Sequence, residues 1–320
     1  MRESELLSHI FSRSAGLHGA HPHVLVGPGD DCAVLSAPAD AKILATVDHL
    51  IEGRHYAAPA GGATSLDAIA RKAIARSVSD IAAMGGSLST WGAALATAAL
   101  PHSFPQRDAD TLFDRMAHWA EHWGCPLVGG DVASFGANPP SAGPLTLTVT
   151  VLGLAHASRG PVLRSTARPG DAVYMTGSLG GSFQSGRHLS FEPRLIEARS
   201  LCDTLGASLH AMMDISDGLG RDAARIAVAS GVVIELDTAS LPRVPGCEWR
   251  DALRDGEDYE LLFTASPDVH VPAICPGPVT PITRIGRVAE AGAAIPNGRC
   301  LVRTTGGGVL DASEQGWDHA

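Results

Sequence analysis

The spacing of apolar residues predicts a chain that alternates between helices and strands. Leu66, Ile69, Ala70 and Ala73 follow the three- and four-residue spacing of one buried helix face, so a helix is expected over residues 65–84. The same spacing predicts helices at 3–13, 104–123, 193–205 and 219–230, whereas shorter apolar runs predict strands at 23–26, 42–51, 87–100, 125–128, 145–152, 172–176 and 232–236. This mixture is typical of an α/β (α+β) protein.

Acidic residues stand beside glycines where several predicted strands begin or end. The segments are Gly29-Asp30-Asp31, Gly129-Gly130-Asp131 and Asp214-Ile215-Ser216-Asp217-Gly218. Closely spaced oxygen ligands suit Mg²⁺ or Ca²⁺ better than zinc. Each segment alone also fits an acidic turn, and Ser216 or Asp217 fits the cap of the helix that begins near Leu219.

Two further acids occupy unusual positions. Asp48 interrupts an apolar strand, where a carboxylate is costly unless it is paired or bound to a metal. Asp80 lies near the C-terminal end of the 65–84 helix, where the helix dipole disfavours negative charge and a cationic partner is expected. Both acids are therefore candidate metal ligands.

Three other features have two interpretations each. The glycine-rich turn Gly177–Ser182 fits either a phosphate cradle or an ordinary strand-to-helix turn. Arg164 fits either a phosphate clamp or a solvent-facing side chain. His55 and the acids of Gly256-Glu257-Asp258-Tyr259-Glu260-Leu261, which is expected to open a strand, fit structural or solvated roles on pattern alone.

Composition narrows the class of protein. At 320 residues, two domains are expected, with a boundary between residues 1–153 and 154–320. The excess of 34 acidic over 24 basic residues argues against nucleic acid as a partner, and the apolar runs are too short for a membrane span. The six scattered cysteines and the lack of a signal peptide predict a reduced, cytoplasmic protein.

Lysine is nearly absent from the chain. Lys42 and Lys72 are the only two, and neither forms the Gly-Lys-Ser/Thr pattern of a Walker loop. If the protein handles phosphate, its negative charge must be neutralised by carboxylate-held metals, arginines and backbone amides.

Six motifs in order resemble the thiamine-monophosphate kinase family, of the aminoimidazole ribonucleotide synthetase-like superfamily. They are Gly29-Asp30-Asp31, Thr46-Val47-Asp48, Ser79-Asp80-Ile81-Ala82-Ala83-Met84-Gly85, Gly129-Gly130-Asp131, Asp214-Ile215-Ser216-Asp217-Gly218 and Gly256-Glu257-Asp258-Tyr259-Glu260-Leu261. The resemblance implies an N-terminal ATP- and Mg²⁺-binding domain, whose mixed sheet pairs with its twin in a homodimer. It also implies a C-terminal α/β domain that completes an active site between the two domains.

The resemblance also implies an activity and its residues. The activity is ATP- and Mg²⁺-dependent phosphorylation of thiamine monophosphate to thiamine diphosphate. The implied Mg²⁺ ligands are Asp31, Thr46, Val47 through its carbonyl, Asp48, Asp80, Asp131, Asp214 and Asp217, of which Asp48, Asp80 and Asp214 are the implied catalytic residues. The implied nucleotide contacts are Gly130, Asp131, Arg164 and Ser216, and the implied thiamine monophosphate contacts are His55, Glu257 and Trp317.

The chemistry agrees with these assignments. Metal ions screen the repulsion between two polyanions and align the attack. The attacking phosphate oxygen is already ionised at neutral pH, so direct in-line transfer needs no strong general base. The sequence departs from the family pattern at Val47, Ser77 and Val132-Ala133. Another ATP-using enzyme of the superfamily, or a non-catalytic metal- or nucleotide-binding protein, remains the alternative.

Overall fold

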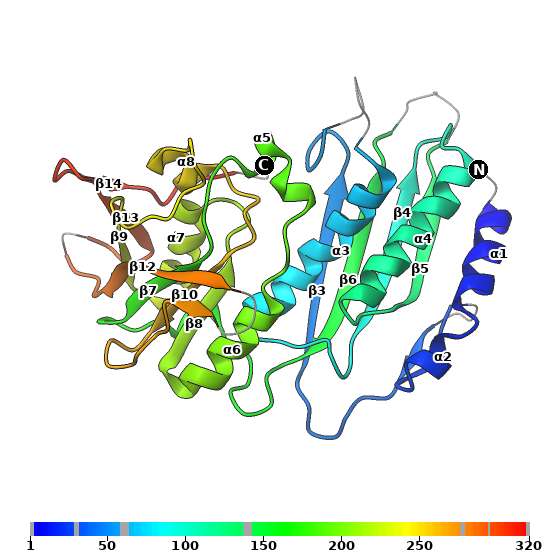
Figure 1. The fold of residues 1–320 in the computed structure, drawn as a ribbon, viewed down its shortest axis with the longest axis horizontal. Coiled ribbons are helices and arrows are strands. Elements are labelled where there is room, and N and C mark those ends of the chain that lie inside the picture. The colour runs from blue at the N-terminus through cyan, green and yellow to red at the C-terminus, as the bar shows by residue number, and fades with distance from the viewer. Residues whose placement is uncertain are drawn as a thin grey trace. The chain divides into compact units, whose positions relative to one another are not determined.

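The computed structural model describes residues 3–28, 32–57, 64–136, 143–275, 279–293 and 295–317 (Figure 1). The chain divides into two compact units. Unit 1 comprises Met1–Ile81 and Ser87–Leu154, and unit 2 comprises Ala82–Gly86 and Ala155–Ala320. Within the described residues, no helix combines the length and the hydropathy that a membrane span requires.

Unit 1 is built on a four-stranded sheet in the order β3-β6-β4-β5. Its elements are α1 (Glu3–Ser14), α2 (Leu17–Ala20), β1 (Val24–Val26), β2 (Val34–Leu35), β3 (Ile43–Ile51), α3 (Leu66–Ala83), β4 (Ala93–Leu100), α4 (Gln106–His122), β5 (Leu127–Ser134) and β6 (Thr146–Leu154). The β4–β5 pair is parallel, and the other two pairs in the sheet are antiparallel.

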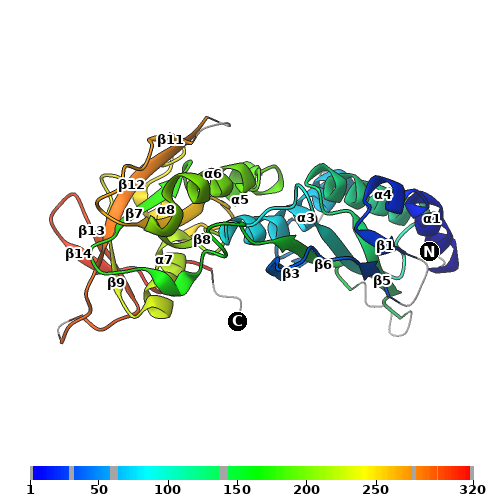
Figure 2. The same ribbon diagram turned by 90° about the horizontal axis from the view of Figure 1, so that it is seen from below.

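Helices α3 and α4 cover one face of this sheet, as Figure 2 shows. Along β6, Leu147, Val149 and Val151 are buried while the threonines between them are only half-buried. This period-two pattern is that of a strand with one face packed in the core. Residues of β3 that pair with the buried β6 residues, including Thr46 and Asp48, therefore lie on the helix-covered face.

Two predicted strands differ from the structure by more than one or two residues at an end. The expected strand at 125–128 extends as β5 to Ser134, so Gly129-Gly130-Asp131 lies inside a strand and not after its end. The reason is the parallel pairing with β4, which continues through Asp131 and which no local pattern reveals. The expected strand at 87–100 begins only at Ala93, after an isolated bridge between Ser87 and Leu154.

Unit 2 contains a larger sheet in the order β14-β13-β9-β12-β7-β10-β8, with β11 paired to β12. Its strands are β7 (Ala172–Thr176), β8 (Leu209–Asp214), β9 (Val233–Asp237), β10 (Leu261–Ala265), β11 (Ile274–Cys275), β12 (Thr280–Ala289), β13 (Arg299–Arg303) and β14 (Val309–Asp311). Its helices are η1 (Arg164–Thr166), α5 (Ser182–Ser185), η2 (Arg187–Leu189), α6 (Leu195–Leu205), η3 (Gly206–Ser208), α7 (Leu219–Ser230) and α8 (Trp249–Arg254).

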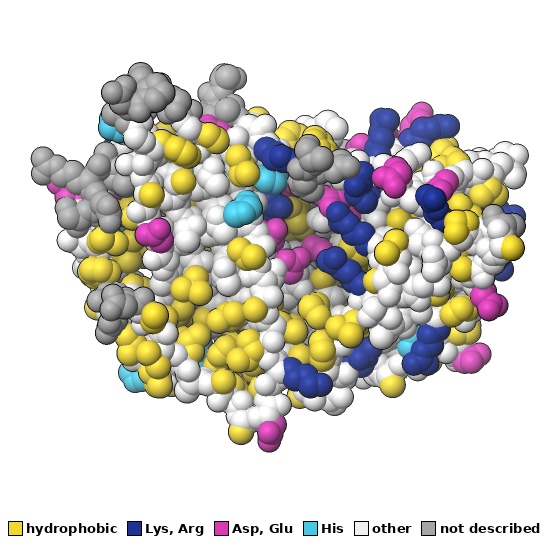
Figure 3. All heavy atoms as spheres, turned by 180° about the vertical axis from the view of Figure 1, so that it is seen from behind, with side chains coloured by type: hydrophobic (Ala, Val, Ile, Leu, Met, Phe, Trp, Pro, Cys, Tyr) yellow, Lys and Arg dark blue, Asp and Glu magenta, His cyan; other side chains and the backbone are white. Residues whose placement is uncertain are grey.

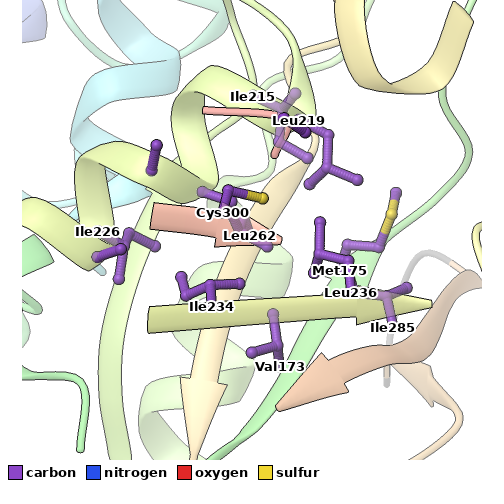
Figure 4. Packing of buried hydrophobic residues seen from close by; sticks show 14 of the residues in the cluster. Val173, Met175, Ile215, Leu219, Ile226, Ile234, Leu236, Leu262, Ile285 and Cys300 are labelled. Carbon is purple, nitrogen blue, oxygen red and sulfur yellow. The ribbon is translucent and has the colours of Figure 1, made fainter. Parts of the chain in front are cut away.

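Both faces of the central strands in unit 2 are buried. Met213 on β8 belongs to the core that packs against α7, and the preceding Met212 belongs to the core that packs against α6. Figure 4 shows the first of these cores, in which Leu219 and Ile226 of α7 meet strand residues such as Met175. A strand with apolar residues on both faces is fully buried. Because β8 is buried on both faces, its last residue, Asp214, has a fixed position, and the candidate site begins at this residue.

Candidate functional site

The segment Asp214–Gly218 connects the end of β8 to the start of α7. The side chains of Asp214 and Asp217 are nearly buried, with residue exposures of 3% and 7%. Gly218 has φ +117°, and a Cβ at this position would lie 2.8 Å from the Leu253 carbonyl oxygen. Only glycine fits such a turn without strain.

Asp222, in the first turn of α7, binds the backbone amides of this loop. Its Oδ2 accepts the backbone N–H groups of Ser216 at 3.0 Å, Asp217 at 3.0 Å and Gly218 at 3.2 Å. The interpretation of Ser216 or Asp217 as the cap of α7 is wrong, because Gly218 is the N-cap residue and no side chain caps it. Burial raises the pKa of Asp222 to about 7, against the opposing effect of Arg225.

Arg225 connects this carboxylate to a predicted metal ligand. Its Nη1 lies 2.6 Å from Oδ1 of Asp222, and its Nη2 lies 2.5 Å from Oδ2 of Asp217. One guanidinium thus neutralises two largely buried carboxylates, which would otherwise repel each other.

The segment Gly256–Glu260 lies beside the same loop. The backbone N–H of Glu257 donates to the Ser216 carbonyl at 2.7 Å, and the N–H of Tyr259 donates to the Ile215 carbonyl at 2.8 Å. Glu257 and Tyr259 have φ of +57° and +53°, a conformation that costs non-glycine residues energy and that concentrates at functional sites. The Tyr259 hydroxyl donates to Glu257 Oε2 at 3.1 Å, which orients this predicted substrate contact.

In the glycine-rich turn Gly177–Ser182, the amides of two glycines already bind carboxylates of the chain. The N–H of Gly180 donates to the carboxylate of Asp258 at 3.2 Å, and the N–H of Gly181 donates to Oδ2 of Asp255 at 3.0 Å. Arg187 pairs with Asp258 at 2.5 Å. The interpretation of these two amides as a phosphate cradle is therefore wrong, because carboxylates of the chain itself already occupy them.

Trp317 is anchored to the loops that carry the acids. Its backbone N–H donates to the Asp217 carbonyl at 2.8 Å, and its indole Nε1 donates to the Asp255 carbonyl at 2.8 Å. The residue is 50% exposed and lines a cavity of about 580 Å³, together with Phe183, Arg250 and Arg254. Unit 2 thus brings together Asp214, Ser216, Asp217, Glu257 and Trp317.

In unit 1, three predicted ligands gather on the helix-covered face of the sheet. The Thr46 hydroxyl donates to the carboxylate of Asp80, which projects from α3. Asp48 lies two residues further along β3, and its Oδ1 is 3.5 Å from Nη2 of Arg76. Arg76 also donates through Nη1 to the His49 carbonyl at 2.6 Å. Hydroxyl and carboxylate oxygens are thus adjacent here.

Asp131 and Val47 lie on the opposite face of the sheet, part of which packs against α2 and the β1–β2 pair. Asp131 pairs with Thr97 in register and is exposed, and the Val47 side chain points to the same face. Gly130 faces the covered side, where a Cβ would lie 1.8 Å from the Ala96 carbonyl oxygen, so strand packing alone demands glycine there. Unit 1 therefore does not group Asp131 with Asp48 and Asp80.

Two hydrogen bonds hold His55 in place, one to its ring and one to its backbone carbonyl. The residue is 6% exposed, its Nδ1 accepts the Ile51 N–H at 2.9 Å, and its carbonyl accepts Nζ of the fully buried Lys72 at 2.5 Å. These contacts fit the structural interpretation of His55. Ser77, a departure from the family pattern, donates its hydroxyl to the Val149 carbonyl at 2.9 Å and so connects α3 to β6.

Two predicted residues stand apart from these groups. Arg164 is exposed on η1, and its carbonyl accepts the hydroxyl of Ser230 at the last residue of α7. Asp217 lies before the first residue of the same helix, so a twelve-residue helix of roughly 18 Å separates the two positions. Asp31 lies outside the described residues.

Sequence reasoning missed the charged residues that hold the loops. Asp222 carried a signal, because it lies three residues after Leu219 and four before Ile226 and so falls on the buried face of its helix. Arg225 also carried a local signal, because it lies three residues after Asp222 on the same helix. Arg187 and Arg194 carried none, because their partners, Asp258 and Glu260, are recognised only in the folded chain.

The donor chemistry fits Mg²⁺ held jointly by protein and substrate. Thr46, Asp48 and Asp80 in unit 1 and Asp214 and Asp217 in unit 2 offer only hard oxygen donors. Among the described residues, no group of three or more His, Cys, Asp or Glu side chains is close enough to hold a metal. Mg²⁺ usually binds one or two carboxylates and completes its shell with water and substrate phosphates.

Comparisons with known proteins extend over most of the chain. Two family models match: AIR synthase related protein, N-terminal domain, at residues 29–155, and AIR synthase related protein, C-terminal domain, at residues 168–295. The chain is 33% identical over 306 residues to a thiamine-monophosphate kinase of Rhodopirellula baltica, covering 89% of each. It is 30% identical over 348 residues to that of Escherichia coli O157:H7, covering 99% of this chain and 98% of the relative.

Solved structures agree with these relatives. The thiamine-monophosphate kinase of Stenotrophomonas maltophilia K279a matches with a TM-score of 0.72 and 27% identity, covering 93% of this chain and 96% of that one. A structure of AaThiL complexed with AMPPCP and TMP matches with a TM-score of 0.68 and 26% identity, covering 100% and 99%. The predicted two-domain fold is thus confirmed, and the chain belongs to the thiamine-monophosphate kinase family within the AIR synthase related proteins.

Proposed function

We propose that this protein transfers the γ-phosphoryl group of ATP to thiamine monophosphate, giving thiamine diphosphate and ADP. One observation carries the proposal: relatives named thiamine-monophosphate kinase align with 89% to 99% of the chain at 33% and 30% identity. The related AaThiL was solved with AMPPCP, an ATP analogue, and with TMP.

Mg²⁺ would be held by the acids of both units. We assign Thr46, Asp48 and Asp80 in unit 1 and Asp214 and Asp217 in unit 2 as its ligands. Asp31, Val47 and Asp131 stay predicted ligands on the family resemblance alone, since Asp131 and the Val47 side chain lie on the other face of the sheet from Asp48. When bound with the substrates, Mg²⁺ screens the charge of the phosphates and aligns the attack. Asp48, Asp80 and Asp214 contribute most to catalysis in this scheme.

The chain needs no general base for this reaction. The nucleophile is a phosphate oxygen of thiamine monophosphate, which is ionised at neutral pH, so the protein has to position two polyanions and compensate their charge. The strained Gly256–Glu260 segment and the buried Asp222 fix the loop that carries Asp214 and Asp217, which supports this positional role.

We assign the nucleotide to Gly130, Asp131, Arg164 and Ser216. A cavity of about 900 Å³ in unit 1 is lined by β5 at Gly129–Asp131 and by apolar side chains such as Leu6 and Ile10 of α1 and Met116 of α4. Apolar walls beside a few polar groups are typical of small-molecule and cofactor sites. We place the adenine in this cavity.

We assign thiamine monophosphate to His55, Glu257 and Trp317. The thiazolium ring of this substrate is a permanent cation, which favours a carboxylate and the face of an indole. The half-exposed indole of Trp317 and the oriented carboxylate of Glu257 support the assignment.

A homodimer through the β3 side of the face opposite α3 and α4 in the unit 1 sheet is part of the proposal. Ile43 and Val47 of β3 are 47% and 59% exposed on this face, and Figure 3 presents its surface, at the left, as mostly hydrophobic and uncharged side chains. Exposed apolar patches of this kind mark protein interfaces. Light scattering at several protein concentrations measures the mass, and a monomer throughout would contradict the dimer.

We also place the reaction in the cytoplasm. All six cysteines are free thiols, which is usual for proteins of reducing compartments.

The activity is tested with the purified protein, ATP, Mg²⁺ and thiamine monophosphate. We expect thiamine diphosphate and ADP in equal amounts, separated by chromatography, and no product when EDTA removes the metal. Thiamine in place of its monophosphate is the control for acceptor specificity. A lack of thiamine diphosphate at saturating metal and substrates would refute the proposed function.

A further inference from the structure

The carboxylate of Asp222 makes an unusual set of contacts for a residue inside a helix. It has 0% exposure, and one of its oxygens accepts three consecutive backbone N–H groups, those of Ser216, Asp217 and Gly218. The other oxygen pairs with Arg225. One oxygen therefore holds one short segment of chain, and the other binds Arg225 of the same helix.

The carbonyl side of the same segment is held by different partners. The Ser216 carbonyl accepts the N–H of Glu257, and the Asp217 carbonyl accepts the N–H of Trp317. The peptide groups of the loop are thus fixed from both sides, with their amides on Asp222 and their carbonyls on the segments that carry two predicted substrate contacts. A shift of the loop would disturb all of these residues together.

We propose that Asp222 is a positioning residue that sets the orientation of the loop carrying Asp214, Ser216 and Asp217. The inference rests on the proposed function, because these three residues act there on Mg²⁺ and the nucleotide. Asp222 itself touches neither substrate nor metal. It acts through three amides and, by way of Arg225, through the carboxylate of Asp217.

A carboxylate suits this role better than its amide. Three N–H donors and a guanidinium all point at Asp222, and a buried anion satisfies every one of them. Asparagine has nearly the same shape, but its NH₂ group would face either the loop amides or Arg225, and one set of donors would lose its acceptor.

The variant to test is Asp222→Asn, with Asp171→Asn as its matched control. Asp171 is also buried, at 2% exposure, and it accepts the Arg168 N–H at 2.8 Å and pairs with His210 at 2.9 Å. It precedes the first residue of β7, whereas Asp214 is the last residue of β8, and the registers of both strands with β10 place these ends at opposite edges of the sheet. Both variants therefore remove a buried charge, and only one of them disturbs the loop.

Three measurements separate positioning from mere stability. Thermal unfolding gives the stability of each variant, calorimetric titration of Mg²⁺ with ADP present gives metal affinity without turnover, and steady-state kinetics give kcat and KM. We expect Asp222→Asn to weaken metal affinity about 10- to 100-fold and to lower kcat, with little change in the KM for thiamine monophosphate. Asp171→Asn should lose stability but keep the metal affinity of the unmodified protein.

Amide hydrogen exchange provides a further test, whose first measurement uses the unmodified protein alone. The amides of Ser216, Asp217 and Gly218 should exchange slowly although they lie in a loop, and Asp222→Asn should release them. Fast exchange of these amides in the unmodified protein, or wild-type metal affinity in a folded Asp222→Asn, would overturn the proposal. Failure to form thiamine diphosphate would instead refute the proposed function, since neither of these two readouts depends on that product.

Discussion

The acids of unit 1 and those of unit 2 are positioned by different means. Thr46, Asp48 and Asp80 project from β3 and α3, whose regular backbone bonds already fix their places. Asp214 ends strand β8, but Asp217 lies in the loop that follows, which has no ladder of its own and depends on buried carboxylates and strained neighbours. Side chains on a strand need few extra contacts, whereas a loop needs a dedicated support to reach the same precision.

The comparison is tested most strongly by Asp214→Asn. We expect kcat to fall at least about 10³-fold, since a lost metal ligand removes several kcal/mol of transition-state stabilisation. Asp203→Asn, an exposed acid on α6, is the control and should retain full turnover. Near-normal rates in a folded Asp214→Asn would show that its carboxylate has only a structural role.

A smaller loss is expected in unit 1 from Asp80→Asn. Because the amide oxygen of the introduced asparagine can still accept the Thr46 hydroxyl, the local geometry should survive and kcat should fall about 10²-fold through loss of charge alone. Asp67→Asn on the same helix is the control, because Asp67 pairs with Arg115 and not with the predicted ligands. Equal kcat values for these two variants would remove Asp80 from the site.

The two units should also differ in the sign of their pH dependence. Burial raises the pKa of Asp258 in unit 2 to about 7, against the opposing effects of Arg187 and the Gly180 N–H. In unit 1 the pKa of Asp67 is lowered, since hydrogen bonds from Trp119 and Arg115 outweigh its partial burial.

An aspartate of the unfolded chain has a pKa of about 3.9. Between that pH and about pH 7, the folded protein therefore keeps a proton on Asp258 that the unfolded chain has lost. Its contribution to stability is complete below about pH 4 and is lost as pH rises to about 7. Relative to Asp258→Asn, the free energy of unfolding should fall by about 1.4 kcal/mol per pH unit between about pH 5 and 6. Urea unfolding at several pH values measures it, and parallel curves for the two proteins would contradict the assignment. Asp67 should show the opposite trend, with its contribution lost on acidification.

The mildest test is Thr46→Val, which removes the hydroxyl that donates to Asp80. A hydrogen bond to a charged group contributes roughly 1.5–3 kcal/mol. Because this hydroxyl orients a ligand and does not bind the reacting atoms, we expect the lower end of that range, about a tenfold fall in kcat/KM. Thr111→Val on α4, whose hydroxyl only donates to the Arg107 carbonyl at 2.8 Å, should have no effect. If both valine variants behave alike, the Thr46 hydroxyl does not position Asp80.

Local patterns predicted the elements whose signals lie within one segment. The bounds of α7 and β7 matched, because an amphipathic period or an apolar run ended at residues that stop it. Strand β5 did not match, since Gly129-Gly130-Asp131 resembles a loop until β4 pairs with it. Strand pairing is non-local, and the sequence of one strand contains little information about which strand it pairs with.

The same limit applies to the site. The unusual acids were visible from their positions, and the family resemblance that they carried is confirmed. The supports of those acids were not visible, since Arg187 meets Asp258 across 71 residues of sequence. The split of the unit 1 acids between the two faces of one sheet also required the register of β5, which places Asp131 away from Asp48.

The internal carboxylates that occupy the loop amides have a consequence for ligand design. At Gly180 and Gly181, and again at Ser216 to Gly218, the positions that attract phosphate in many nucleotide-binding proteins are filled by aspartates of the chain itself. An inhibitor that carries a bare anionic group, such as a sulfonate, would find these amides taken and several carboxylates nearby. We expect compounds that carry a chelated metal or a cationic ring to bind this surface more tightly than bare anions do.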